Sequence, residues 1–163
     1  SQLDSGGMPL NLELASLSDL ISDTLESFSS LAAQKGVKLC GFAEDGVDPV
    51  TMDVLWMGRA FNNLVSNAIR YTPKDGEINL TATYDGNHIF VNIRDSGEGI
   101  SPEDIPHVFE RFYRGDKSRS RISGGSGLGL AITKGVVEAH HGDITVQSDR
   151  RTGTVFTISL PRH

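Results

Sequence analysis

Three stretches of the chain carry apolar residues at the spacing of an amphipathic helix. The first covers residues 16–34 and ends before Gly36, because glycine readily adopts the left-handed conformation that terminates a helix. The second covers residues 52–72 and stops at Pro73, since the residue before a proline is pushed away from helical geometry. The third covers residues 128–140 and follows a run of glycines. The pattern therefore predicts three helices.

Elsewhere the apolar period changes to two, which indicates strands. Residues 37–42 form a short apolar run that suits a strand. Residues 78–84 and 89–93 alternate on either side of an Asp-Gly pair, which predicts an antiparallel hairpin. Residues 144–146 and 156–160 alternate in the same way and predict two further strands near the end of the chain.

Two segments show no clear period. Residues 1–15 contain glycine and proline and are typical of a connector that enters a domain. The acids and proline of residues 101–104 indicate the start of a helix that leads into residues 108–114. Residues 115–125 are almost without apolar side chains, so we expect a mobile lid over about residues 101–124.

Composition and charge narrow the classes of protein. The chain has 163 residues, of which 37% are apolar and 22% charged, as expected for one domain with its own core. A formal net charge of -6 argues against a general surface for nucleic acid or anionic membrane. The single cysteine, Cys40, and the lack of a membrane-length apolar run favour a cytoplasmic setting.

The basic residues are concentrated in one segment of this acidic chain. Residues 111–121 hold five basic side chains against one acidic side chain. Such a segment either recognises a polyanion or forms a solvated surface loop, and the charge alone leaves both interpretations open.

The glycine run of residues 124–129 opens the third predicted helix. Glycines allow close approach of a ligand, and the unpaired N–H groups of a helix N-terminus favour an anion such as a phosphate chain. A flexible turn without a ligand is the alternative. Gly129 is followed by Leu130 and Ala131, whereas a Walker loop needs Lys and then Ser or Thr at these positions.

Two further groups of polar residues have the chemistry of a binding site. Asn63 and Asn67 share one face of the second predicted helix, either as a solvated stripe or as a pair of amides aimed at a ligand or metal. Asp95 ends a predicted strand, and the glycines that follow allow a tight exit, so its carboxylate can face a cavity.

Four segments in this order resemble the ATP-binding catalytic domain of bacterial sensor histidine kinases, in the Bergerat-fold (GHKL) ATPase superfamily. Residues 63–72 are similar to the N box of that family and residues 95–99 to its first glycine box. Residues 109–114 are similar to its F box and residues 125–130 to its second glycine box. The resemblance covers nearly the whole chain. It departs from the family at His141, because the family usually reads His-Gly-Gly at this point.

The resemblance implies an α+β fold, a two-layer sandwich in which a mixed sheet of about five strands carries three helices on one face. It places the catalytic domain at residues 16–163, and it implies that ATP and Mg²⁺ are the cofactors. The residues that it assigns to the nucleotide site are Asn63, Asn67, Arg70, Tyr71, Asp95, Gly97, Gly99, Ile100, Arg114, Gly125, Ser126, Gly127, Leu128 and Gly129.

The same resemblance gives the main residues their roles. Asn67 would ligate Mg²⁺ through its amide oxygen, and Asn63 would complete that site as a catalytic residue. Arg70 and Arg114, also catalytic, would neutralise phosphate charge. Asp95 would accept the adenine amino proton.

The remaining roles concern the base and the phosphates. Tyr71 would pack against the adenine, and Gly97 and Gly99 would admit the ring. The glycines at 125, 127 and 129 would cradle the phosphates.

The resemblance also implies partners. The phosphoacceptor histidine would lie on a dimerisation domain outside this sequence, and the next acceptor would be the receiver domain of a response regulator. The parent protein would be a homodimer, with any membrane segment upstream of Ser1 and this domain on the cytoplasmic side. For the chain itself we expect no contact with nucleic acid or membrane.

Two other functions stay open at this point. A nucleotide-binding interaction module, or pseudokinase, would bind ATP without transferring phosphate. Another ATPase of the same superfamily would carry Glu where Asn63 stands and would lack residues 109–114.

Overall fold

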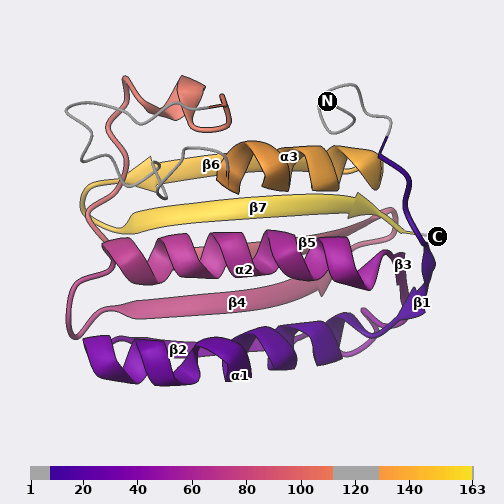
Figure 1. Ribbon diagram of the computed structural model, residues 1–163, viewed down its shortest axis with the longest axis horizontal. Helices are drawn as coiled ribbons and strands as arrows, with labels where there is room; N and C mark the ends of the chain where they lie inside the picture. Colours follow the sequence, from indigo (N-terminus) through magenta and orange to yellow (C-terminus); the bar gives the residue numbers. More distant parts are fainter. Residues whose placement is uncertain (1–7, 112–128, 163) are drawn as a thin grey trace.

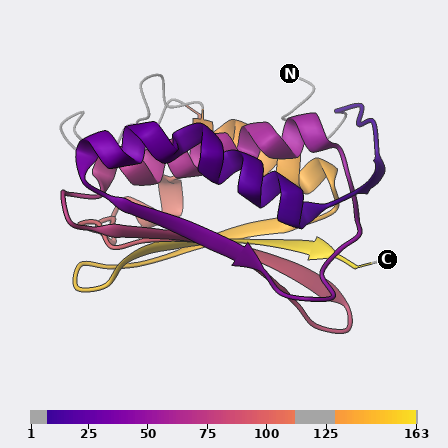
Figure 2. The same cartoon turned by 90° about the horizontal axis from the view of Figure 1, so that it is seen from below.

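The protein is a two-layer structure in which helices cover one face of a sheet. The computed structural model describes residues 8–111 and 129–162. Three α-helices pack side by side on one face of a five-stranded sheet, as Figures 1 and 2 show from two directions. No helix in these described parts is long and apolar enough to cross a membrane.

The elements follow one another with short connections. In chain order they are β1 (Glu13–Ala15), α1 (Leu17–Lys35), β2 (Lys38–Ala43), β3 (Val50–Met52), α2 (Val54–Tyr71), β4 (Glu77–Tyr84), β5 (His88–Asp95), the 3-10 helix η1 (Ile105–His107), α3 (Gly129–Ala139), β6 (Asp143–Asp149) and β7 (Gly153–Pro161).

The main sheet has the order β2-β4-β5-β7-β6. The β2–β4 pair is parallel and the other three pairs are antiparallel, so the sheet is mixed. The predicted α+β fold, with about five strands and three helices on one face, is confirmed.

The period of two in the strands builds the core. Alternate side chains of β5 and β7 are buried against the helices, and α2 contributes a fully buried stripe from the opposite side. The buried residues of these three elements include Met57, Phe61, Leu64, Val65, Ile89, Val91, Ile93, Phe156, Ile158 and Leu160. Burial of this stripe determines which face of α2 remains available for ligands.

Side chains from distant parts of the chain satisfy the helix ends. Ser16 caps α1 by accepting from the Asp19 N–H (3.0 Å), and Asp48 accepts from the Leu17 N–H at the same end. Lys35 at the end of α1 donates from Nζ to the carbonyl oxygens of Ile69 and Arg70, both at 2.6 Å. These bonds hold the C-terminus of α2 beside that of α1.

The helices α1 and α3 end in the same hydrogen-bonding motif. After α1, Val37 N–H donates to Ala32 O (2.9 Å) with Gly36 at φ 77°. After α3, Gly142 N–H donates to Val137 O (3.0 Å), but the left-handed residue is His141, at φ 63°. A non-glycine residue in this conformation costs roughly 1 kcal/mol, so His141 ends the helix less favourably than glycine would.

The structure differs from the predictions in two places. The short strands β1 and β3 pair antiparallel with Leu14 opposite Thr51, and each has only three residues, too few for a period of two to show. The helix predicted from residues 101–104 onward is wrong over the described residues, where only η1 forms. Pro106 lacks an N–H and disfavours helical geometry at the residue before it.

Asp53 joins three segments at the N-terminus of α2. Its carboxylate accepts from the backbone N–H groups of Asn11 (2.8 Å) and Trp56 (3.1 Å), and its own N–H donates to His140 Nε2 (3.0 Å). His140 Nδ1 contacts Val136 O at 2.8 Å, so His140 bridges the end of α3 and the start of α2. Burial alone would raise the pKa of Asp53, but the backbone hydrogen bonds and the attraction of His140 lower it below its ordinary value.

We predict that Asp53→Asn lowers the free energy of unfolding by about 1–2 kcal/mol at pH 7, because an amide cannot accept from both N–H groups as a carboxylate does. The pKa of Asp53 is depressed in the folded state, so this stabilisation is present above the unfolded pKa. It is lost as the pH falls below about 4, through the folded pKa. Urea unfolding from pH 7 to pH 3 measures it, with the exposed Asp23→Asn as control; a difference that stays constant with pH would contradict the assignment.

Candidate functional site

The first asparagine of α2 is fixed against the start of α3. Asn63 donates from Nδ2 to Gly129 O (3.2 Å) and to Thr133 Oγ1 (3.4 Å), and Thr133 Oγ1 donates to the same carbonyl at 2.9 Å. Because both bonds of Asn63 use the amide nitrogen, its amide oxygen is the group left for a ligand. The two helices therefore bring Asn63 and Gly129, which are 66 residues apart in the chain, into direct contact.

Asn67 lies one turn further along α2 and is only 7% exposed. Its Nδ2 is fully buried and has no hydrogen-bond partner within residues 8–111 and 129–162, although buried amides are nearly always paired. The polar face of α2 is therefore not simply a solvated stripe. An amide without a partner among the described residues, beside Asn63, fits a site for a bound ligand.

Asp95 ends β5 on the face of the sheet that carries the helices. It is 2% exposed, and its Oδ1 accepts from the Gly97 N–H at 2.9 Å. The antiparallel register of β5 and β7 places Asp95 directly opposite Thr154, which is 1% exposed. Gly153, the residue before Thr154, has a φ of 98°, and a Cβ at Gly153 would collide with the carbonyl oxygen of Asp95. The buried carboxylate therefore depends on glycine in the neighbouring strand.

The turn after Asp95 folds back onto β6. Gly99 is left-handed at φ 82°, and a Cβ there would lie 3.1 Å from Ser148 Oγ. The next residue, Ile100, is buried, and its N–H donates to Ser148 Oγ at 2.6 Å. Gly99 is thus required by the backbone and by its contact with β6.

The remaining predicted site residues divide into two groups. Arg70 is exposed and Tyr71 half-buried, and both lie in the last turn of α2, at the end of the sheet that holds Asp95. Arg114, Gly125, Ser126, Gly127 and Leu128 lie outside the described residues. The described structure thus joins the N box to the last glycine of the second glycine box through Asn63 and Gly129.

A cavity of about 400 Å³ lies between α2 and α3 and includes Asn63 in its lining. The other lining residues are Trp56, Arg59, Asn62 and Ile132. The Arg59 guanidinium stacks over the Trp56 ring, 4.8 Å from its centroid, which holds a positive charge at the wall of the cavity.

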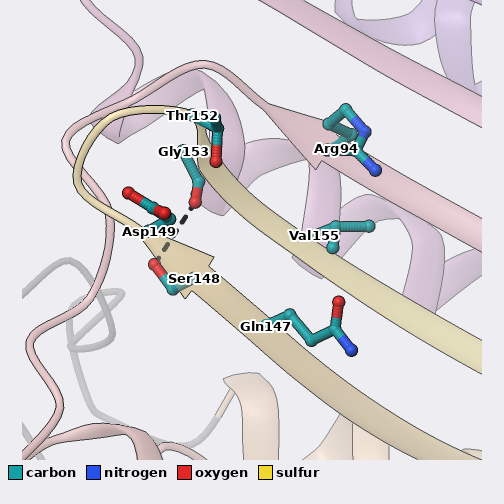
Figure 3. Close-up of a pocket in the computed structure, with 7 residues that line it drawn as sticks. All are labelled: Arg94, Gln147, Ser148, Asp149, Thr152, Gly153 and Val155. Atoms are coloured by element: carbon teal, nitrogen blue, oxygen red, sulfur yellow. Dashed lines mark hydrogen bonds between the residues drawn. The ribbon is translucent and has the colours of Figure 1, made fainter.

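A second cavity, of about 280 Å³, lies where β5 and β6 end and β7 begins (Figure 3). Arg94, Val155 and Gln147 occupy one row of the register and line it. In each strand the residues next to these three face the helices, so this row lies on the opposite face of the sheet. None of the predicted site residues lines this cavity.

Ser148 and Thr154 join the site although the motifs do not include them. They are register partners in β6 and β7, and their hydroxyl oxygens are 3.0 Å apart. The sequence does hold a signal for both. The inward positions of these strands are apolar until the strand end next to Asp95, where the pattern continues with a hydroxyl residue.

The comparisons with known proteins agree with this geometry. Residues 52–163 match the family model described as histidine kinase-, DNA gyrase B-, and HSP90-like ATPase. The sensor histidine kinase RppB of Synechocystis sp. is 37% identical over 99% of this chain and 36% of its own length. The sensor histidine kinase CusS of Escherichia coli is 40% identical over 99% of this chain and 33% of its own.

A solved structure supports the same relationship. The mycobacterial sensor histidine kinase MprB superposes with a TM-score of 0.76 at 30% identity, over 94% of this chain and 99% of that one. The chain spans about a third of the length of the two curated relatives named above.

We predict that Asn67→Leu leaves the free energy of unfolding of the ligand-free chain unchanged or raises it by up to about 1 kcal/mol, because leucine removes an unpaired buried donor at similar volume. The matched Asn63→Leu should lower it by about 1 kcal/mol, since it removes two hydrogen bonds. Chemical denaturation measures both. A loss of more than about 1 kcal/mol for Asn67→Leu would mean that Asn67 has a structural partner in the folded chain.

Proposed function

Because the chain belongs to the family of histidine kinase-, DNA gyrase B- and HSP90-like ATPases and has the catalytic domain of a sensor histidine kinase, we propose that it transfers the γ-phosphoryl group of ATP to a histidine on a dimerisation domain outside this sequence. The receiver domain of a response regulator would take the phosphoryl group next. The observation that carries this proposal is the pair of asparagines on α2, one tied to α3 and the other buried with an unpaired amide.

Asn67 fits a shared site for Mg²⁺ and phosphate. Its amide oxygen is a hard ligand of the kind that Mg²⁺ accepts, and its unpaired amide nitrogen can donate to a phosphate oxygen. A single neutral ligand cannot fill six coordination positions, so nucleotide phosphates and water would supply most of the others. When bound, the ion would neutralise negative charge on the phosphates.

Asp95 fits the role of base recognition. Its carboxylate is buried at the sheet end, where it can accept from the exocyclic amino group of adenine. Guanine would present a carbonyl oxygen to the same carboxylate, and two opposed acceptors are unfavourable. Tyr71, half-buried at the end of α2, would pack against the base.

The charges near the phosphates would come from two arginines. Arg70 is exposed in the last turn of α2, and Arg114 lies outside the described residues. Phosphoryl transfer depends mainly on positioning and on neutralising charge, and guanidinium groups match phosphate oxygens in geometry. Asn63, with its amide oxygen available beside Gly129, would position the reacting group.

Two of the described histidines lie away from the proposed phosphate site. His88 begins β5, at the end of the strand opposite Asp95, and His140 is buried between α2 and α3. His107 contacts Glu110 Oε2 through Nδ1 at 2.8 Å, and His141 follows the C-terminus of α3. On this proposal the acceptor imidazole would come from another domain.

We predict that ATP binds at one site with an affinity that depends on Mg²⁺. Asn67→Ala should lower the affinity for ATP about tenfold or more in Mg²⁺ and have little effect in chelator, because the side chain and the phosphates would share the ion. Isothermal titration calorimetry measures both conditions. Asn87→Ala, an exposed asparagine in the turn between β4 and β5, is the matched control. Equal affinities with and without Mg²⁺ would contradict the assignment of Asn67.

We also predict that the chain alone does not become labelled by γ-labelled ATP, but labels the dimerisation domain of its parent protein added as a separate chain. The reason is that the site can position the phosphates while the acceptor lies elsewhere. Arg70→Ala should slow the transfer about tenfold or more. Label on the chain itself would contradict the first part. ATP binding without transfer to the parent domain would instead support a nucleotide-binding module.

A further inference from the structure

We infer that Ser148 is a positioning residue of the nucleotide site, which holds the turn after Asp95 and the hydroxyl of Thr154 in the arrangement that recognises the base. This inference rests on the proposed function. Ser148 would act through these two partners without touching the nucleotide.

The first partner is the turn that follows Asp95. The buried N–H of Ile100 donates to Ser148 Oγ at 2.6 Å, across 48 residues of chain. Gly99 lies against the same hydroxyl, where its missing Cβ would come within 3.1 Å. Among the residues that the structure describes, the Ile100 N–H donates to this side chain alone, so loss of the hydroxyl would free the turn to move away from β6.

The second partner is Thr154. The register pairs Asp95 with Thr154 and Thr154 with Ser148, so the three side chains form one row across β5, β7 and β6 on the face toward the helices. Thr154 is fully buried, and its Oγ1 lies 3.0 Å from Ser148 Oγ. The row ends at the carboxylate that is proposed to select adenine.

The proton count of the two hydroxyls explains how Ser148 can orient Thr154. Ser148 has one proton, which can reach Thr154 Oγ1 at 3.0 Å or Gly153 O at 3.4 Å, the bond drawn in Figure 3. The shorter contact is the stronger one. With Ser148 as donor, the proton of Thr154 is left free to turn along the row toward Asp95, where it can bond the carboxylate or a base held by it.

The experiment compares Ser148→Ala with the unsubstituted chain in two measurements. Hydrogen exchange of the Ile100 amide, followed by NMR without ligand, should become at least about tenfold faster, because its acceptor is gone. NMR titration should then show the affinity for Mg²⁺–ATP lowered about tenfold, while the affinity for inorganic triphosphate with Mg²⁺ stays within about twofold. A purely structural role would lower both affinities alike.

Two variants serve as controls. Ser148→Thr keeps the hydroxyl and should retain the ATP affinity within about threefold. Ser159→Ala makes the same change in β7, on the face away from the helices, and should alter neither measurement.

Three outcomes would overturn the inference. Unchanged exchange at Ile100 would mean that Ser148 does not hold the turn. If Ser148→Ala exchanged faster at Ile100 but kept the same ratio of ATP affinity to triphosphate affinity as the unsubstituted chain, Ser148 would have no part in base recognition. An unsubstituted chain that binds neither ligand would contradict the proposed function and, with it, the role in recognition, while the exchange of Ile100 would still report on the contact itself.

Discussion

The antiparallel register between β5 and β7 is the constraint on which the candidate site depends. It sets Asp95 opposite Thr154 and requires a residue without Cβ at Gly153, where any side chain would meet the carbonyl oxygen of Asp95. A slip of one residue would turn Asp95 to the opposite face of the sheet, away from the helices. The apolar partners further along both strands prevent that slip, because the same register buries Ile93 against Phe156. The core and the site are therefore specified by one set of pairings.

The helices α2 and α3 supply the other residues of the candidate site. Contacts at both ends of α2 and between α2 and α3 hold these residues in position. Lys35 holds the C-terminus of α2, and Asp53 holds its N-terminus to both His140 and the segment at Asn11. With α2 fixed at both ends, Asn63 reaches Gly129 on α3, and Asn67 remains buried without a partner. An unpaired buried amide costs stability, and such costs are typical of functional sites.

The sequence predicts the elements that carry the candidate site better than it predicts the connections. The helix of residues 52–72 and the strand that ends at Asp95 are both confirmed, because long runs of regular apolar period are determined by burial of one face. The helix expected after residue 101 is wrong, since cap-like residues and acids do not outweigh Pro106. The strands β1 and β3 were not predicted. They pair with each other although they lie nearly forty residues apart, and such a pairing produces no pattern in the sequence around either strand.

The sequence by itself determined the three helices and the residues that α2 and β5 present, because these follow from local periodicity. Its resemblance to a known family implied the α+β class and the order of the boxes. Only the tertiary structure decided that Asn63 bonds Gly129, that Asn67 is buried and unpaired, and that Ser148 and Thr154 extend the row begun by Asp95. The physical reason is that each of these contacts joins segments whose separation along the chain is bridged by strand register and helix packing. Strand register and helix packing cannot be derived from the residues next to a position in the sequence, because both depend on how all the elements pack into one core.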